Sequence, residues 1–226
     1  MCIRDRHMEV GVPSHCAGHI SIHGLKTLGL DIPVDLIESE IRIANFHSPS
    51  GKTLRVEYTK PVTYVVNRIL FDRYLAELAT RAGVSYLKGI HAESLWIDSS
   101  RIRGISARGE KQLQVEAKVV IDAEGVHAGL LKKAHLPIPR RKATVIGAQG
   151  FSARVTDIEP ESVEVYLGSS YAPGFFAWII PRQDGSAKVG LAANSGNPRV
   201  LLEYFVTRHP AAVSYTHLTL PTNREV

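Results

Sequence analysis

The hydrophobic pattern is most informative at residues 172–193, where apolar runs flank Asp184-Gly185 on both sides. Asp-Gly suits a tight two-residue turn, so this stretch predicts a β-hairpin. Both predicted faces are apolar, which indicates a strand pair covered on both sides. With Gln183 opposite Ser186, the expected cross-strand partners are Ile180 with Val189, Ile179 with Gly190, Trp178 with Leu191, and Ala177 with Ala192.

The period of the pattern changes between residues 40 and 87. Residues 40–60 alternate at period two around a Ser-Pro-Ser-Gly turn and predict a second hairpin. A β-rich run at 62–66 is followed by apolar residues at helical spacing over 67–83, with Gly83 at the helix end. A further strand at 84–87 completes a predicted β-α-β unit.

The remaining residues are predicted to be mainly strand. Residues 91–118 alternate between turn glycines and predict a three-stranded meander. The apolar run at 119–125 predicts a buried parallel strand, and strands at 143–155 and 162–168 lead into the hairpin. The expected fold class is mixed α/β, with a partial Rossmann-like domain interleaved with an antiparallel sheet domain.

Composition narrows the choice of partners. A hydrophobic content of 44% over 226 residues can form a real core, and the net charge of +5 suits acidic head groups, pyrophosphates or an anionic membrane surface. No basic cluster indicates nucleic-acid binding. A basic run flanks residues 135–139; it is either a solvated face or a site for lipid phosphate. Its members are Lys132, Lys133, Arg140, Arg141 and Lys142.

Location is inferred from what the chain lacks. It has only two cysteines, which implies no disulfide framework and a reducing compartment. No apolar run is long enough to span a bilayer, which needs about 20 residues. We therefore expect a cytoplasmic protein that could contact a membrane at its periphery. Residues 1–6 and 213–226 are similar to translated sequencing-adaptor read-through and are left out of the domain prediction.

Three histidines at spacing four, His15, His19 and His23, would form one face on an unbroken helix beside Cys16. Such a face could bind a metal ion. Two glycines within this stretch argue against a rigid helix, and no carboxylate completes a ligand set. We therefore predict a solvated histidine-rich face and no metal site.

The hairpin residues carry a family resemblance. Ala172-Pro173-Gly174, an aromatic, Ala177-Trp178, two aliphatics, Pro181 and Val189-Gly190-Leu191 resemble the signature hairpin of the geranylgeranyl reductase family of flavoproteins. Phe176 stands where that family usually has Tyr, and Ile180 where it has Phe. The resemblance implies that the hairpin lines an isoprenoid cavity. The implied substrate-binding residues are Pro173, Gly174, Phe176, Trp178, Ile180, Pro181 and Gly190.

The same resemblance implies FAD as the cofactor. The small-residue turn Cys16-Ala17-Gly18 resembles the turn that packs by the flavin ring, which would put Cys16 near the reacting double bond. An inert buried-type cysteine is the alternative. Arg68 resembles the arginine that approaches the flavin in para-hydroxybenzoate hydroxylase-type flavoproteins, the alternative being an exposed helix-start arginine. Asp122, Ala123 and Gly125 resemble the second flavin motif.

The chain contains no Gly-x-Gly-x-x-Gly motif, so the first flavin motif is expected upstream of residue 7 and the third beyond residue 212. The implied domains are an FAD-binding domain (7–39 and 62–137) and a substrate-binding sheet domain (40–61 and 138–212).

The implied function is reduction of double bonds in geranylgeranyl lipid chains, with NAD(P)H or ferredoxin both open as electron donor. Because the first and third flavin motifs are expected to lie outside this chain, the chain alone is expected to be inactive. A related flavin monooxygenase or halogenase, or a non-catalytic lipid- or metal-binding fragment, remains an alternative.

Overall fold

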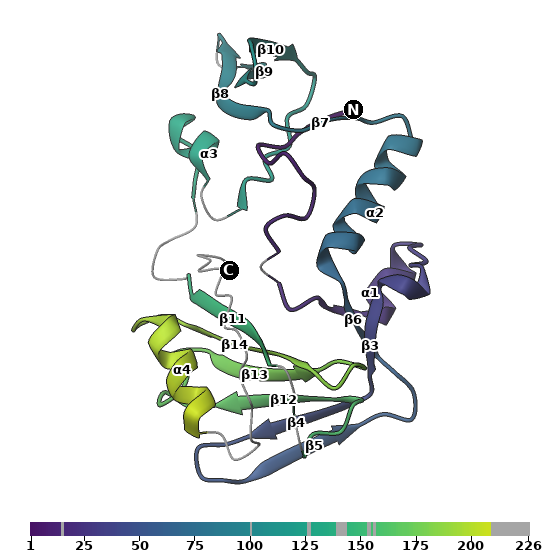
Figure 1. Cartoon of the computed structure of the whole chain (residues 1–226). Coiled ribbons are helices and arrows are strands. Elements are labelled where there is room, and N and C mark those ends of the chain that lie inside the picture. The colour runs from purple at the N-terminus through teal and green to yellow at the C-terminus, as the bar shows by residue number, and fades with distance from the viewer. Residues whose placement is uncertain are drawn as a thin grey trace. The chain divides into compact units, whose positions relative to one another are not determined.

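The computed structural model in Figure 1 describes residues 1–14, 16–99, 101–125, 128–138, 144–152, 155 and 157–208. The chain divides into two compact units, which are described separately. The first contains residues 1–12 and 69–141, and the second contains residues 13–68 and 142–226. The expected mixed α/β fold class is confirmed.

A six-stranded sheet forms the centre of the second unit, in the order β11-β14-β13-β12-β4-β5 (Figure 1). Its only parallel pair among the described strands is β12 with β4, which brings residues about 120 positions apart side by side. The predicted hairpin in residues 40–60 is confirmed as β4 and β5. The strands are β4 (Ile43–His47), β5 (Thr53–Glu57), β11 (Ile146–Ser152), β12 (Ser162–Leu167), β13 (Phe176–Pro181) and β14 (Ala187–Ala193).

The helix α4 (Pro198–Arg208) covers one face of this sheet. Its Leu202 and Phe205 are fully buried against Ile179 and Leu191 of the hairpin. Burying a side chain of this size contributes about 1.5–3 kcal/mol, so this layer is the main core of the unit.

A second, smaller sheet has the order β2-β6-β3. Its Ile41 and Val65 pack with Val163 and Ile180 of the six-stranded sheet, on the face opposite α4. The helix α1 (Ile22–Thr27) follows β2, and Ser21 caps it by accepting a hydrogen bond from the Gly24 amide at 3.1 Å. The other elements are β2 (His19–Ser21), the short 3-10 helix η1 (Val34–Leu36), β3 (Ile37–Ile41) and β6 (Thr63–Val66).

The first unit contains the meander predicted for residues 91–118. It is confirmed as a sheet in the order β10-β9-β8, and the predicted helix is confirmed as α2, which starts at the boundary of the two units. A two-stranded parallel sheet pairs β1 with β7. The elements are β1 (Cys2–Arg4), α2 (Arg68–Arg81), β7 (Ser85–Leu87), β8 (His91–Asp98), β9 (Arg101–Arg108), β10 (Gln112–Glu116) and α3 (Gly129–Lys133).

Two strand predictions are wrong. The strands β6 and β7 lie in different sheets, so they do not form a β-α-β unit within one sheet. The apolar run at 119–125 is not a strand, and Val119 and Ile121 are 77% and 79% exposed. A strand needs a neighbour for its backbone hydrogen bonds, and an apolar run does not reveal whether one is available.

The compact units differ from the predicted domains, because residues 13–39 fold with the six-stranded sheet. Compactness does not say which residues bind a cofactor, so the functional domain assignment stays a prediction. No helix in the described part of the chain is long and apolar enough to cross a membrane.

Candidate functional site

The turn of the β13–β14 hairpin is longer than predicted, which changes the register. Arg182 donates its backbone N–H to the Ser186 carbonyl at 2.8 Å, so the loop has three residues and Gly185 takes φ of +80°. The Asp184 carboxylate accepts from the Ser186 amide at 2.9 Å and stabilises this loop. A three-residue loop with a left-handed glycine is a common hairpin connection, and it shifts the pairing by one residue.

The predicted register is therefore wrong. The observed partners are Ala177 with Leu191, Trp178 with Gly190, Ile179 with Val189, Ile180 with Lys188, and Pro181 with Ala187. A shift of one residue exchanges the faces of one strand relative to the other. Ile179 and Gly190, which were expected to be cross-strand partners on one face, lie on opposite faces. Ile179 belongs to the core under α4.

The other face of the hairpin, which we call the Trp178 face, carries Phe176, Trp178 and Ile180 from β13 and Lys188, Gly190 and Ala192 from β14. Gly190 is expected to leave room for a substrate. Instead, a Cβ atom there would lie 2.5 Å from a ring carbon of Trp178. The indole therefore fills the space above Gly190, and the ring can pack there because glycine has no side chain.

An aromatic cluster continues from the indole toward the surface. Phe176 meets Trp178 edge-on with ring centroids 6.0 Å apart, and Phe175 stacks on Phe176 at 4.3 Å. Phe175 is 36% exposed, so the cluster runs from a half-buried tryptophan to solvent. Rings in these arrangements add about 0.5–1.5 kcal/mol per pair beyond the contribution of their burial. Phe175, Phe176 and Trp178 therefore form an aromatic wall that is rigid as well as apolar.

The remaining hairpin candidates have supporting positions. Gly174 has φ of +75° and packs against the Asn194 side chain, while the Pro173 carbonyl accepts from the Asn194 amide at 2.9 Å. Ile180 is 3% exposed and lies in the core between the two sheets. The Pro181 carbonyl accepts from the Ser39 hydroxyl at 3.0 Å. These contacts fix the two ends of β13 and leave Phe176 and Trp178 as its accessible aromatic side chains.

Two polar atoms on the Trp178 face are buried and have no hydrogen-bond partner among the described residues. They are Nε1 of Trp178 and Oε1 of Gln149. Gln149 is 9% exposed and lies on β11 directly opposite Gly190, so both atoms belong to the same part of the sheet. A buried polar atom without a partner costs about 1–3 kcal/mol, which a polar group of a ligand or a water molecule can offset. The sequence prediction missed Gln149; a lone polar residue inside an apolar strand is the feature that could have indicated it.

The predicted small-residue turn lies against this face. Ala17 packs on the cluster that contains Ile180 and Trp178, and the Gly18 carbonyl accepts from the Val66 amide at 2.9 Å. Gly18 has φ of +79°, and a Cβ atom there would come within 2.2 Å of the Val66 carbonyl oxygen. Only glycine allows this approach. Cys16, which is exposed, directly precedes Ala17 in this turn.

The histidines do not share a helix. His19 lies in β2 with its Nε2 atom 2.6 Å from the Thr63 hydroxyl, His23 lies in α1, and His15 lies outside the described residues. No group of three potential metal ligands occurs in the described part of the chain.

The flavin candidates in the first unit occupy a loop. Asp122 accepts from the Glu124 amide through Oδ1 at 2.9 Å, while its Oδ2 atom is buried and has no partner within the described ranges. Glu124 in turn accepts from the Leu130 amide at 2.7 Å and orders the start of α3. Gly125 has φ of +70°, and nothing lies within 4 Å of where its Cβ would be. Ala123 completes this open loop. Arg68, at the start of α2, belongs to the second unit.

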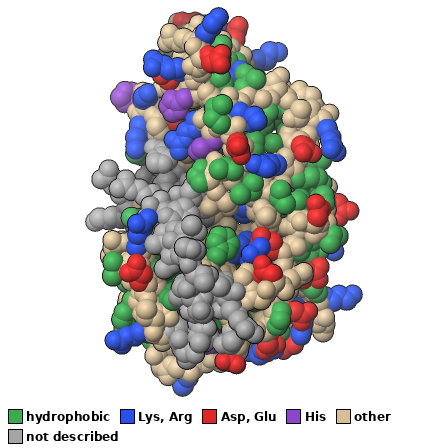
Figure 2. Space-filling model, in the orientation of Figure 1, with side chains coloured by type: hydrophobic (Ala, Val, Ile, Leu, Met, Phe, Trp, Pro, Cys, Tyr) green, Lys and Arg blue, Asp and Glu red, His purple; other side chains and the backbone are tan. Residues whose placement is uncertain are grey.

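The basic run is described only in part. Lys132 and Lys133 end α3, and Lys133 donates to the Glu93 carbonyl at 2.6 Å. Residues 139–143 lie outside the described residues. On the face in Figure 2, basic and acidic side chains are interspersed.

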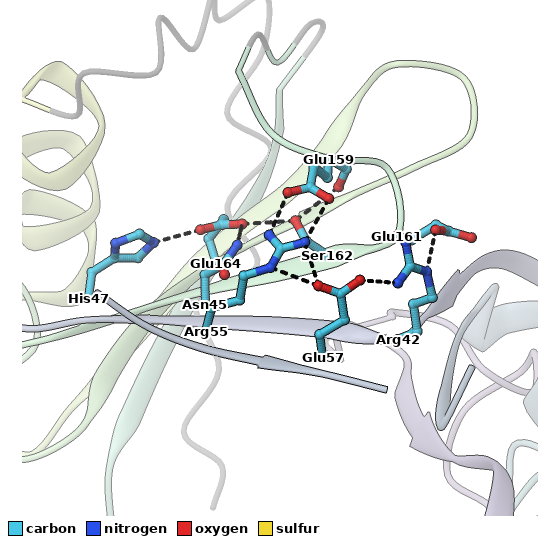
Figure 3. Close-up of polar contacts among 9 residues, drawn as sticks. All are labelled: Arg42, Asn45, His47, Arg55, Glu57, Glu159, Glu161, Ser162 and Glu164. Atoms are coloured by element: carbon cyan, nitrogen blue, oxygen red, sulfur yellow. Dashed lines mark hydrogen bonds and ion pairs between the residues drawn. The ribbon is translucent and has the colours of Figure 1, made fainter. Parts of the chain in front are cut away.

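A second polar cluster lies on β4, β5 and β12 (Figure 3). The Glu164 carboxylate is 5% exposed and contacts Asn45 at 2.8 Å, Ser162 at 2.8 Å and His47 at 2.6 Å. Around it, Arg55 pairs with Glu57 and Glu159, and Arg42 pairs with Glu57 and Glu161. The hydrogen bonds that Arg55 donates to Glu159 and Glu57 raise the pKa of Arg55. Since the groups satisfy one another across the parallel β12–β4 pair, the cluster holds this pairing together.

Comparison with known proteins places these features in context. The family model for the geranylgeranyl reductase catalytic domain matches residues 145–219, which include the hairpin. A digeranylgeranylglycerophospholipid reductase from Methanothermobacter thermautotrophicus is 32% identical over 188 residues, covering 83% of this chain and 49% of that protein. The chain thus spans about half the length of the curated relatives it matches.

Solved structures extend the comparison. A geranylgeranyl bacteriochlorophyll reductase-like protein from Thermoplasma acidophilum superimposes with a TM-score of 0.90 at 27% identity, over 97% of this chain and 58% of that chain. A flavin-dependent brominase has a TM-score of 0.71 at 16% identity, over 94% of this chain and 55% of that chain, which indicates a shared fold only.

Proposed function

Because the chain belongs to the geranylgeranyl reductase family, we propose that the protein is part of an FAD-dependent reductase that saturates double bonds in the isoprenoid chains of a lipid. The names of its relatives suggest geranylgeranyl chains on a glycerophospholipid as the substrate. A lipid substrate and the net charge of +5 support activity in the cytoplasm at a membrane surface.

The observation that carries the proposal is the aromatic wall of the Trp178 face. Phe176 and Trp178 offer a rigid apolar surface, and they lie inside the region matched by the family model. An isoprenoid chain has no hydrogen-bonding group along its length, so such a surface is what it needs to bind. In the adjacent turn, Cys16 directly precedes Ala17, which packs against this face.

Taken separately, residues in each unit suit chemical groups of FAD. The Oδ2 atom of Asp122, which has no partner among the described residues, can accept a hydrogen bond from a sugar or ribityl hydroxyl, and the open space at Gly125 allows close approach to its backbone. The Arg68 guanidinium can neutralise phosphate charge. Ala17 and Gly18 provide a surface without bulky side chains. Bound reduced FAD supplies the hydride for the reduction of a double bond.

The part of this chain in the reaction is to bind and orient the lipid. The aromatic wall holds an isoprenoid unit by apolar contact and excludes water from it. The buried indole N–H of Trp178 and the amide of Gln149 are available to a polar atom at the same place. Because the ring of Trp178 is seated over Gly190, its orientation is defined before the lipid binds.

The test is replacement of Trp178 by Ala in the complete, flavin-containing protein, with Trp96→Ala as the matched control. Trp96 lies on β8 in the first unit. We expect Trp178→Ala to reduce lipid reduction at least tenfold with unchanged flavin content, since about 1.4 kcal/mol of lost binding gives a factor of ten. Reduction is measured as a gain of two hydrogens per double bond by mass spectrometry. Equal loss of turnover and flavin would refute a role at the substrate.

A monooxygenase or halogenase of the same fold is the alternative. It would consume oxygen, and incubation with geranylgeranyl lipid would give no product heavier by two hydrogens. That result would reject the reductase proposal while keeping the flavoprotein assignment.

A further inference from the structure

Lys188 occupies an unusual position on the Trp178 face. It is the second residue of β14, in which every residue is buried, and only 4% of its surface is exposed. Transferring an ammonium group out of water is costly unless it is paired and hydrogen-bonded. Its partners should therefore account for its presence in an otherwise apolar strand.

The ammonium connects three segments that are far from it in the sequence. It donates hydrogen bonds to the carbonyls of Ala17 at 2.9 Å and Val66 at 3.3 Å. It also forms an ion pair with the Glu38 carboxylate on β3 at 2.6 Å, although this contact lacks the angle of a hydrogen bond. Two of the three N–H donors of the ammonium are thus used on backbone carbonyls, and its charge is balanced by Glu38.

The neighbouring charges offset part of the cost of burying the Lys188–Glu38 ion pair. Burial lowers the pKa of Lys188, and attraction to Glu38 opposes that shift. The nearby Arg182 guanidinium also lowers it, but Arg182 itself contacts the other oxygen of Glu38 at 3.2 Å. A Cys16 thiolate would favour the charged lysine. The Glu38 carboxylate thus bridges two cations of the hairpin.

The segments joined by Lys188 are those that surround the candidate site. Ala17 lies in the turn that carries Cys16, and Val66 ends β6 just before Arg68. The Val66 amide donates a hydrogen bond to the Gly18 carbonyl, so the backbone of the turn is joined directly to the end of β6. Lys188 attaches this backbone to the strand that carries Gly190.

We propose that Lys188 is a positioning residue, whose buried ammonium, paired with Glu38, holds the turn at residues 16–18 and the end of β6 against the Trp178 face. The consequence for catalysis, that it sets the position of the Cys16 thiol relative to the lipid, rests on the proposed function. The attachment itself does not depend on flavin or lipid. A buried ion pair is a poor source of net stability compared with apolar packing, so positional specificity is a better account of its presence.

Hydrogen exchange of this 226-residue chain, read by mass spectrometry of its peptides, tests this attachment. Lys188→Met keeps the length and apolar character of the side chain and removes its donors. We expect amides in residues 13–21 and 64–67 to exchange roughly tenfold faster, as expected for the loss of two hydrogen bonds, while those in α4 and in β8–β10 do not change. Lys188→Arg keeps a charged donor and should restore slow exchange.

The control is Arg55→Met, which removes an ion-paired cation from the exposed edge of the same unit. It should leave residues 13–21 unchanged. If Lys188→Met does not fold, Glu38→Gln tests the same attachment, because it keeps the ammonium and removes only its counter-charge. Exchange that rises equally throughout the second unit, or that stays unchanged in 13–21, would overturn the proposal. Selective loosening in a complete protein without reductase activity would instead refute the proposed function and support the positioning role.

Discussion

A methyl group added at Gly190 is the most direct probe of the candidate site. The new Cβ atom would lie 2.5 and 2.7 Å from two ring carbons of Trp178 and 3.0 Å from the Ala148 carbonyl oxygen. Since carbon atoms pack at about 3.5–4.0 Å, the indole must move by about 1 Å or more. Overpacking of this kind costs typically 1–3 kcal/mol, so we expect Gly190→Ala to lower the free energy of unfolding by about 2 kcal/mol.

Gly147 provides the matched control on the neighbouring strand. A Cβ atom there would meet its nearest neighbour, the Leu191 carbonyl oxygen, at 3.5 Å, which is an ordinary contact. Gly147→Ala should therefore change stability by less than about 0.5 kcal/mol or raise it slightly, because alanine restricts the unfolded chain. Urea unfolding followed by circular dichroism gives both values. Equal effects of the two substitutions would refute the seating of the indole on Gly190, as would a Gly190→Ala penalty that persists when Trp178 is also replaced by Ala.

Three further predictions concern the turn, the polar cluster and the buried lysine. Gly185→Ala should cost about 1 kcal/mol of stability in urea unfolding, because φ is +80° there while the space around it is open; no loss would contradict the left-handed turn. Glu164→Ala should cost about 2 kcal/mol by the same measurement, since it removes the carboxylate that Asn45, His47 and the buried Ser162 share, and a loss below 0.5 kcal/mol would argue against the cluster. Burial lowers the pKa of Lys188 in the folded protein below its usual 10.5. At pH values between that lowered pKa and 10.5, the unfolded chain binds more protons than the folded protein, so the contribution of this group to stability rises with pH. Lys188→Met should remove that rise in unfolding free energies measured up to pH 10.5, and an identical slope in the variant would contradict it.

The elements that sequence predicted correctly depend on local patterns. The helix over Arg68–Arg81 follows from apolar residues at helical spacing and from Gly83, which has φ of +84°. The meander and both hairpins follow from alternation between turn residues. These features are decided within a few residues of one another, so a single sequence contains the information.

The register of the main hairpin is a different case. Asp-Gly is compatible with a two-residue loop, but hydrogen bonds from Ser186 to the Asp184 carboxylate favour a three-residue loop. This choice between two turns decides whether Ile179 or Trp178 faces the core. Periodicity could not resolve it, because both faces of each strand are apolar.

The polar groups of the site were not predicted because their partners are distant in sequence. Glu38 lies 150 positions before Lys188, and Gln149 meets Gly190 through the pairing of β11 with β14. The sequence does contain a hint: a lysine in the run Ala-Lys-Val-Gly-Leu-Ala-Ala is a polar residue where the pattern requires burial. Such a residue indicates that a partner exists but not which one.

The corrected register also changes how the site can discriminate ligands. A groove lined by Gly190 and Ile179 would accept any thin apolar chain, since no side chain would define its shape. With the indole seated on Gly190 and Phe176 edge-on to it, the wall has a defined shape, and its indole N–H has no acceptor in the part of the chain that the structure describes. Ligand binding at the proposed site therefore depends on how the Trp178 ring is held. The space that Gly190 leaves for the ring and the attachment of the neighbouring turn by Lys188 both contribute to this. Discrimination at the proposed site would then depend on two residues of the same strand, Lys188 and Gly190 of β14, although neither of them is aromatic.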